Sequence, residues 1–345
     1  MLLLCRCARG APDHEDAGWA PIISVRAGPD GTLFVAAAEK GGVYSSTNGG
    51  KSWRHIGGTL APDNLFSLRV SAGGDVFLAT FGEALYSGDG GVSWSFLKED
   101  GFIKDLFPAR SGAILAANWR GGLSSASAET GIWKSVGDDA FLITDFMESE
   151  DKRLWCAAFG GGVLVSYDGG ISWGSCGGGP ENGMVLSLAW SPGDKILYAG
   201  TYEGGVFMRR EDGPWQRGPG GLPRGSTVQA LTVSKDGSLW AGTHGNGCFV
   251  LKRGSKNWEN LTEGGGKGVS VTAIEPFRDG VVFGTASGGL YYAEAGRSFV
   301  RPLLPSDPVA GLAELESGAV TALSRSGRLY RSDDRGVTWK EIELP

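Results

Sequence analysis

Side chains with aromatic or imidazole rings recur at one position of a unit that repeats about every 41 residues. This position lies four residues before the apolar residue that begins the third expected strand of each unit. Through eight units it is occupied by Glu39, Phe81, Trp119, Phe159, Tyr202, His244, Ala286 and Arg325. Rings in five consecutive units could stack on sugars or hold the apolar and aromatic side chains of a peptide. We therefore take these residues, without Ala286, as the candidate ligand-binding ring.

Two interpretations of these rings remain open. They could contact a ligand, with Trp119 and Tyr202 as the principal contacts, and with polar neighbours close by in the chain: Arg120, Glu203, Asn246 and Lys40. Alternatively, each ring could be a consensus residue of the repeat that packs on the adjacent glycine pair. A Trp119→Ala variant that loses stability but keeps every ligand interaction would favour packing.

A search for catalytic and metal-binding residues is mostly negative. The three histidines, His14, His55 and His244, are too dispersed for a metal site, and the five cysteines form no CxxC pair. We expect no catalytic residue, metal or cofactor. If the protein is instead a glycoside hydrolase, loop carboxylates such as Glu83 and Glu203 are the candidates.

Two markers show that the repeat covers nearly the whole chain. Each unit ends in an aromatic residue, in the order Trp53, Trp94, Trp133, Trp173, Trp215, Trp258, Phe299 and Trp339. A short apolar segment that ends in small residues precedes each of them by about twenty positions, as in 33–36 and 154–157. A fixed period of this length indicates copies of one supersecondary unit that are stacked or arranged around an axis.

One unit, residues 22–57, shows what each copy should form. Apolar runs at 22–27, 32–37, 43–46 and 53–56 alternate with Gly-rich turns, without helical periodicity. The 59 glycines in 345 residues fall largely in these turns. Four-stranded sheets at a period of about 40–45 residues predict an all-β fold, a single β-propeller of antiparallel blades. Eight blades fit best, with seven as the alternative.

The loops of such a blade fall on two faces. The loop between the second and third strands should open on the same face as the connectors between blades, and the turn between the third and fourth strands on the other. The candidate rings should therefore converge around one mouth of the central channel.

The turn before each terminal tryptophan has its own pattern. Its clearest copies are 87–94, 166–173 and 332–339, with the sequence Ser-x-Asp-x-Gly-x-Ser/Thr-Trp. The carboxylate can accept backbone N–H bonds across the turn, the glycine adopts the tight conformation, and the indole anchors the hairpin. We assign a structural role to Asn48, Trp53, Asp89, Trp94, Asp168, Trp173, Asp334 and Trp339.

These turns resemble the Asp-box, or BNR repeat, of propeller proteins, and the resemblance extends over almost the whole chain. It is strongest to the non-catalytic photosystem II assembly factor-like and sortilin-type branch, and it implies a binding scaffold that holds a partner protein at the channel face. The sialidase-superfamily branch and other glycan-active propellers imply the alternative, a carbohydrate-binding or glycan-hydrolysing protein.

The chain departs from both enzyme types. Sialidases carry an Arg-Ile-Pro segment near the start, where this chain has Trp19-Ala20-Pro21, and no arginine trio is recognisable. Xyloglucanases place two propellers face to face, whereas this repeat accounts for one.

Composition and charge narrow the partners and the compartment. A net charge of −6 without a basic run argues against nucleic acid, and no stretch is apolar enough for a transmembrane helix. Residues 1–20 are expected to be a tail or the remnant of an export signal, and 21–345 the propeller. Secreted, periplasmic or lipoprotein locations are favoured over the cytoplasm, and we expect a monomer.

Overall fold

A computed structural model describes most of the chain from residue 22 onward. The described residues are 22–37, 42–48, 53–57, 65–80, 83–98, 103–127, 132–136, 141–177, 180, 183–262, 268–277, 280–285, 290–294, 301–304, 309–314, 319–324, 328–333 and 339–342. The expected tail or export remnant, residues 1–20, lies outside them.

Within these residues the strands pair in eight four-stranded antiparallel sheets, each in sequence order. The first four sheets consist of β1 (Ile22–Ala27), β2 (Leu33–Ala37), β3 (Gly42–Ser46), β4 (Arg54–His55); β5 (Leu65–Val70), β6 (Val76–Thr80), β7 (Glu83–Ser87), β8 (Ser95–Lys98); β9 (Ile103–Pro108), β10 (Ala113–Asn118), β11 (Leu123–Ser127), β12 (Lys134–Ser135); and β13 (Leu142–Glu148), β14 (Leu154–Phe159), β15 (Gly162–Ser166), β16 (Gly174–Ser175). The other four consist of β17 (Val185–Ser191), β18 (Ile196–Thr201), β19 (Gly205–Arg210), β20 (Gln216–Arg217); β21 (Val228–Val233), β22 (Leu239–Thr243), β23 (Gly247–Leu251), β24 (Glu259–Asn260); β25 (Val271–Phe277), β26 (Gly280–Thr285), β27 (Leu290–Glu294), β28 (Arg301–Leu304); and β29 (Val309–Glu314), β30 (Val320–Ser324), β31 (Leu329–Ser332), β32 (Lys340–Ile342).

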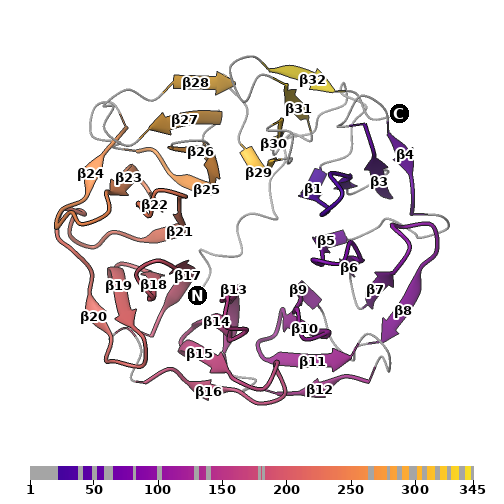
Figure 1. Ribbon diagram of the computed structural model, residues 1–345, viewed down its shortest axis with the longest axis horizontal. Coiled ribbons are helices and arrows are strands. Elements are labelled where there is room, and N and C mark those ends of the chain that lie inside the picture. Colours follow the sequence, from indigo (N-terminus) through magenta and orange to yellow (C-terminus); the bar gives the residue numbers. More distant parts are fainter. Residues whose placement is uncertain are drawn as a thin grey trace.

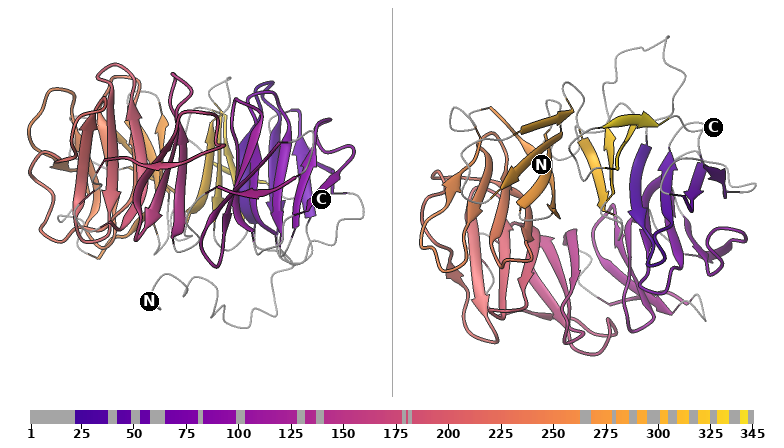
Figure 2. Two further views of the ribbon diagram at one scale, coloured as in Figure 1. Left: turned by 90° about the horizontal axis from the view of Figure 1, so that it is seen from below. Right: turned by 45° about the horizontal axis from the view of Figure 1, so that its top comes forward.

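The sheets are arranged around a central axis, with the first strand of each nearest the axis and the fourth at the rim (Figure 1). Viewed from the side they form a flat disc (Figure 2). Strand β29 contacts both β25 and β1, so the last sheet lies beside the first. The prediction of an all-β propeller with four-stranded antiparallel blades is confirmed, and we call the sheets blades, numbered along the chain.

The first blade tests the expected unit directly. Its three inner strands lie where the apolar runs predict them. The rim strand β4 is shorter than expected, only two residues long, and both of them are exposed. As expected, the last blade supplies its own fourth strand, β32, which pairs with β31.

The innermost strand of every blade contains an irregularity that the sequence pattern did not predict. In β13, for example, the pairing with β14 skips a residue between Ile143 and Asp145. Such a bulge turns the extra residue out of the ladder. Here that residue is Thr144, whose hydroxyl donates to the carbonyl of Val185 in the next blade at 2.9 Å. This bulge thus ties the fourth blade to the fifth.

Apolar side chains fill the spaces between adjacent blades. Between the first two blades, Phe34, Val43 and Ile56 pack against Leu65, Leu68 and Val76. Burying a side chain such as Leu68 contributes about 2 kcal/mol. Rim tryptophans extend the packing backward along the chain, because Trp94 Nε1 donates to the carbonyl of Ile56 at 2.7 Å. The core is therefore a series of layers between blades.

Candidate functional site

Hydrogen bonds between loops define the two faces of the disc. The loop between the second and third strands of a blade bonds to the connector between blades, as Gly162 N does to Gly183 O at 2.9 Å and Tyr202 N to Met184 O at 2.9 Å. We call this side the connector face. The turn between the first and second strands of one blade instead contacts the turn between the third and fourth strands of the next. Ser111 Oγ in the third blade, for example, donates to Gly169 O in the fourth at 3.2 Å. We call that side the turn face.

Four of the candidate rings lie at the connector face, each at the end of a second strand. Trp119 follows β10 and is 40% exposed. Phe159 ends β14, Tyr202 follows β18 and His244 follows β22. Glu39, Phe81 and Arg325 fall outside the described residues, as does the neighbouring Lys40.

The rings of neighbouring blades come into contact in one place. The centroids of Phe159 and Tyr202 are 6.1 Å apart, and their planes meet at 75°. His244 is exposed, and its Nδ1 lies 3.2 Å from the hydroxyl of Ser270. The fourth to sixth blades therefore present ring side chains on one face, and two of these rings form an edge-to-face pair.

The polar candidates surround these rings. Glu203 is exposed and has a φ of 54°, a left-handed conformation that a side chain adopts at a cost. Its backbone N–H donates to Thr227 Oγ1 at 3.0 Å, which holds the loop in place. Arg120 and Glu83 are also exposed. Asn246 donates to the carbonyl of His244 at 3.3 Å.

A pocket of about 400 Å³ is lined by Glu203, the residue that follows Tyr202, and sequence reasoning missed it. It lies between the Glu203–Gly205 loop and the connector that runs from 218 to 225, with Leu222 and Arg224 in its wall. The only sequence signal is this connector itself, Gly-Pro-Gly-Gly-Leu-Pro-Arg-Gly, which is rich in turn residues. The pocket gives the connector face a recess beside the rings.

The carboxylates assigned a structural role are fully engaged within their own turns. Asp168 accepts bonds from Ser166 Oγ at 2.8 Å and Ser172 N at 2.9 Å on one oxygen, and from Ser172 Oγ at 2.6 Å on the other. The Ser172 hydroxyl and backbone bonds hold the pKa of Asp168 down at about 2. Asp89 makes equivalent bonds with Ser87 and Ser93.

The other residues assigned a structural role in these turns make some of the same hydrogen bonds. Ser46 Oγ donates to Asn48 Oδ1 at 2.9 Å, so the amide oxygen stands in for the carboxylate. Trp173 Nε1 donates to Gly170 O at 3.2 Å, within its own turn. Trp53 and Trp339 are half-buried, and Asp334 lies outside the described residues.

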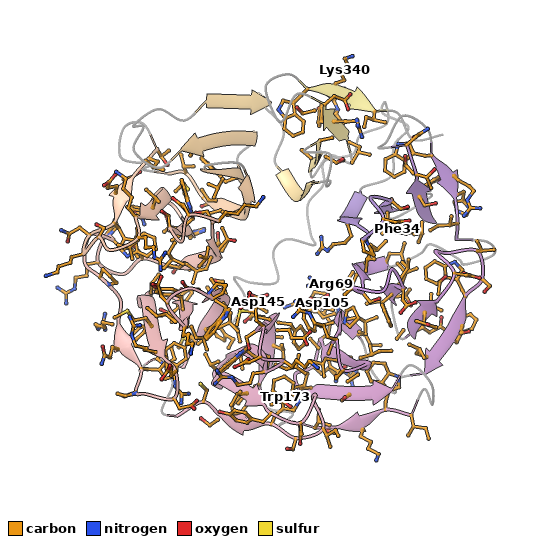
Figure 3. The ribbon with its side chains drawn as sticks, in the orientation of Figure 1. Phe34, Arg69, Asp105, Asp145, Trp173 and Lys340 are labelled. Carbon is orange, nitrogen blue, oxygen red and sulfur yellow. The ribbon has the colours of Figure 1, made fainter. Side chains whose placement is uncertain are left out.

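A charged cluster on the channel wall was also missed by sequence reasoning. Arg69 on β5 forms an ion pair with Asp105 on β9, which also accepts a bond from Ser67 Oγ at 2.6 Å. Asp145 occupies the equivalent position on β13, close to this pair (Figure 3). The only signal in the sequence was a polar residue within the first strand of each of these blades, whose other residues are mainly apolar.

The two carboxyls on the wall differ in their environments. Burial raises the pKa of Asp145 to about 6, although N–H groups of Leu188 and Phe146 each donate to it at 2.9 Å. Burial also opposes ionisation of Asp105, but the Arg69 guanidinium and the Ser67 hydroxyl outweigh it and lower its pKa. The channel therefore holds one ionised carboxylate beside one that is protonated far more readily.

The described part of the chain shows neither a metal-ligand cluster nor a membrane-spanning helix. It contains no group of three or more His, Cys, Asp or Glu side chains that could hold a metal ion. It also contains no helix that is long and apolar enough to cross a membrane.

Comparisons with known proteins identify the fold. No family model matches the chain, and no curated protein matches it. Among solved structures, the computationally designed Ika8 protein is similar with a TM-score of 0.69 and 15% identity, over 92% of this chain and 97% of the design. This similarity shows that the fold is a β-propeller.

Two other solved structures are similar at comparable levels. An ancestral GH74 enzyme gives a TM-score of 0.60 and 18% identity over 94% of this chain, which spans about half of the enzyme, 55% of its length. YCF48 bound to a D1 peptide gives a TM-score of 0.59 and 13% identity, over 94% of this chain and 98% of that one. At these identities the similarity shows the fold alone.

Proposed function

We propose that this protein is a non-catalytic scaffold whose connector face holds a segment of a partner protein. The observation that carries the proposal is the edge-to-face pair of Phe159 and Tyr202, flanked along the same face by Trp119 and His244. Partly exposed aromatic side chains held by a rigid framework are typical anchors of protein interfaces.

The surroundings of the rings suit a peptide segment. The pocket between the Glu203 loop and the following connector could receive one side chain of the partner, and its wall offers both Glu203 and Arg224 for polar contacts. Backbone bonds to the connectors fix the loops that carry the rings, so little conformational entropy is lost on binding.

The similar structures give indirect support. YCF48, which is similar over 94% of this chain, has a D1 peptide bound in its solved structure. That a propeller of this size takes a peptide is consistent with a scaffold role here, although the sequence identity of 13% carries nothing over residue by residue.

A peptide-display selection against the purified protein tests the proposal. We expect selected peptides to bind the wild-type protein, and to bind Trp119→Ala and Tyr202→Ala at least about tenfold more weakly. Phe96→Ala is the matched control, because Phe96 is an exposed ring on the rim strand β8, away from the connector face. Peptides that bind both variants at full strength would place the interaction elsewhere.

Glycan binding or hydrolysis is the second candidate function. Glycosidases use one carboxyl as acid and another as base or nucleophile. Asp105 and Asp145 suit these two roles, because Arg69 keeps Asp105 ionised whereas the pKa of Asp145 is about 6. The fold is also that of a GH74 enzyme. Plant, microbial and sialylated glycans should be tested for saturable binding with Trp119→Ala alongside, and for hydrolysis with Asp145→Asn. Release of sugar that Asp145→Asn abolishes would establish an enzyme.

We also propose that the ring is closed by eight blades and that its turns are Asp-boxes. Eight sheets and the contact between β29 and β1 support the first proposal. The bonds of Asp89 and Asp168 support the second. Deleting one complete unit should prevent closure, so a folded, monomeric seven-unit variant would contradict an eight-bladed ring.

Export to the cell surface or beyond, and a monomeric state, complete the proposal. The chain is similar to the extracellular domain of BT4673 from B. thetaiotaomicron, with a TM-score of 0.53 and 12% identity over 94% of this chain and 52% of that one. Fractionation of cells that produce the native gene, and light scattering of the purified protein, test these two points.

A further inference from the structure

One buried position of the repeat carries a charge in a single blade. The third strand of each blade has a residue that pairs with the first part of the second strand, as Ser166 does with Leu154 and Arg209 with Leu197. Across the eight blades this position is occupied by Ser46, Ser87, Ala126, Ser166, Arg209, Leu251, Ala293 and Ser332, all of them buried. Only the fifth blade has an ionised side chain there.

The turn of the fifth blade explains how this arginine is accommodated. In the second blade, Gly91 packs directly on Ile56 of the preceding blade. The fifth blade has one residue fewer between Arg209 and Trp215 than the second has between Ser87 and Trp94, and it lacks the glycine pair. Arg209 therefore extends toward the fourth blade, where its guanidinium meets the sulfur of Cys176.

The guanidinium of Arg209 has only weak partners. The residue is 7% exposed, and its Nε has no acceptor among the described residues. Its nearest carboxylate is Asp212, at 3.8 Å, which is 70% exposed and lies closer to Arg153. Burial raises the pKa of the Cys176 thiol despite the nearby guanidinium, and a protonated thiol is a weak acceptor. A buried charge is costly unless it is well paired.

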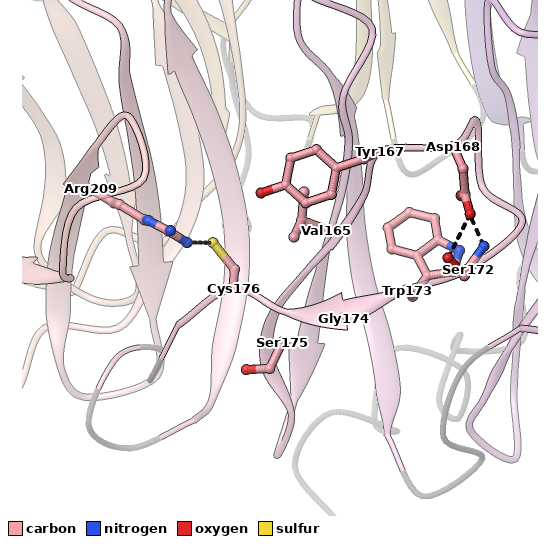
Figure 4. A pocket seen from close by; sticks show the side chains of 9 residues that line it. All are labelled: Val165, Tyr167, Asp168, Ser172, Trp173, Gly174, Ser175, Cys176 and Arg209. Carbon is pink, nitrogen blue, oxygen red and sulfur yellow. Dashed lines mark hydrogen bonds between the residues drawn. The ribbon is translucent and has the colours of Figure 1, made fainter.

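The poorly paired guanidinium lines a pocket. This cavity of about 410 Å³ lies at the rim between the fourth and fifth blades, and Val165, Tyr167 and Trp173 supply its apolar and aromatic surface. In Figure 4 the hydroxyl of Tyr167 is directed toward the side on which Arg209 meets Cys176. Asp168 is turned away into its own bonds with Ser172. The volume lies within the range of pockets that hold small molecules.

We propose that this rim pocket binds a small carboxylate whose charge pairs with Arg209 and whose apolar body packs on Tyr167 and Trp173. A planar carboxylate matches the fork of donors on a guanidinium. The negative charges of Asp168 and Asp212 close by favour a single negative charge over a phosphate dianion. The site is separate from the rings of the connector face, and it does not depend on the function proposed for them.

The experiment compares acids with their uncharged amides, with binding measured by calorimetry. Phenylacetate and phenylacetamide form one pair. A short peptide that ends in phenylalanine forms the other, once with a free carboxyl terminus and once amidated. We expect both acids to bind saturably and neither amide to bind. Tighter binding of the acidic peptide would identify a chain terminus as the natural source, and tighter binding of phenylacetate a free organic acid.

Variants assign the binding to Arg209. Arg209→Met should weaken acid binding at least about tenfold, and Arg209→Lys should have a smaller effect because it keeps the charge. Arg210→Met is the matched control, because Arg210 is exposed and lies outside the pocket. The proposal is overturned if acids and amides bind alike, if no acid binds saturably to the wild-type protein, or if Arg209→Met binds as the wild type does. The first two comparisons need no variant, so an unfolded Arg209→Met protein would leave the test intact.

Discussion

Phe159 and Tyr202 belong to neighbouring blades, and their rings meet edge to face with centroids 6.1 Å apart. Each ring therefore has a packing partner as well as an exposed side. Contact with a neighbour and contact with a ligand are compatible for these residues, and the two effects can be measured separately.

A double-mutant cycle on this pair should reveal coupling in the free energy of unfolding. Edge-to-face pairs contribute about 0.5–1.5 kcal/mol beyond the area they bury. We expect Phe159→Ala and Tyr202→Ala together to destabilise the protein less than the sum of the single variants, by about that amount. Chemical denaturation of the four proteins measures it, and additivity within about 0.3 kcal/mol would mean that the rings do not interact in solution.

Two adjacent glycines of one turn should respond very differently to alanine. Gly90 and Gly91 have φ values of 69° and 88°, so alanine is strained at both, by about 1–2 kcal/mol. A Cβ at Gly90 meets nothing within 4 Å, whereas one at Gly91 would lie 2.3 Å from Cδ1 of Ile56 in the preceding blade. We expect Gly91→Ala to lower the free energy of unfolding clearly more than Gly90→Ala. Equal losses would show that the second blade does not pack on the first in this way.

Layers between blades should dominate stability. Leu68 is fully buried between the first two blades, so Leu68→Ala should cost about 2–5 kcal/mol in thermal or chemical unfolding. Phe96→Ala, which removes a larger but 59% exposed side chain from the same blade, should cost within about 0.5 kcal/mol. A Leu68→Ala protein as stable as the wild type would contradict the packing described here.

Asp145 should make the protein less stable as the pH rises. Its pKa is about 6 in the folded protein against an ordinary value of 3.8, so the folded state holds the proton more tightly than the unfolded chain does. The stability that comes from the protonated carboxyl is complete below pH 3.8 and is lost as the pH rises through 6.

Asp145→Asn isolates this effect. The N–H groups of Leu188 and Phe146 bond to different oxygens of Asp145, so the one amide oxygen of asparagine keeps one of these two bonds. Asparagine carries no charge near Arg69 and Asp105. We expect the variant to gain stability relative to the wild type between about pH 4 and pH 7, by an amount on the order of 1–3 kcal/mol. Unfolding curves at the two pH values measure the gain, and a difference that does not change with pH would disprove the assignment.

Much of the fold could be predicted from the sequence because it depends on local signals. Alternating apolar runs and Gly-rich turns predicted four strands per unit, and in the first blade three of the four lie where expected. The rim strand β4 covers only two of the four residues of the run 53–56 that predicted it. The bulges of the innermost strands depend on how blades meet, so a single unit gives no sign of them.

The candidate site likewise has a part that could be predicted from the sequence and a part that could not. Alignment of the repeat placed Trp119, Phe159, Tyr202 and His244 on one face, because equivalent positions occupy equivalent places in each blade. The Asp105–Asp145 cluster, the pocket beside Glu203 and the burial of Arg209 arise between blades, from residues far apart in the chain. Comparing Arg209 with Ser87 and Ser166 would have shown a departure from the repeat, but not the cavity that accompanies it.

The rim tryptophans have a consequence for how the chain acquires its structure during synthesis. Trp94 donates to Ile56, and Trp215 to the carbonyl of Cys176 at 2.7 Å, so in both cases a later blade completes an earlier one. Because the ribosome releases the amino-terminal part first, the rims of the first and fourth blades gain these bonds only after about 40 more residues have emerged. The last blade instead contacts the first, through β29 and β1. Closure of the ring therefore requires that the first and last blades have both been synthesised, and until then each exposes an apolar face to chaperones.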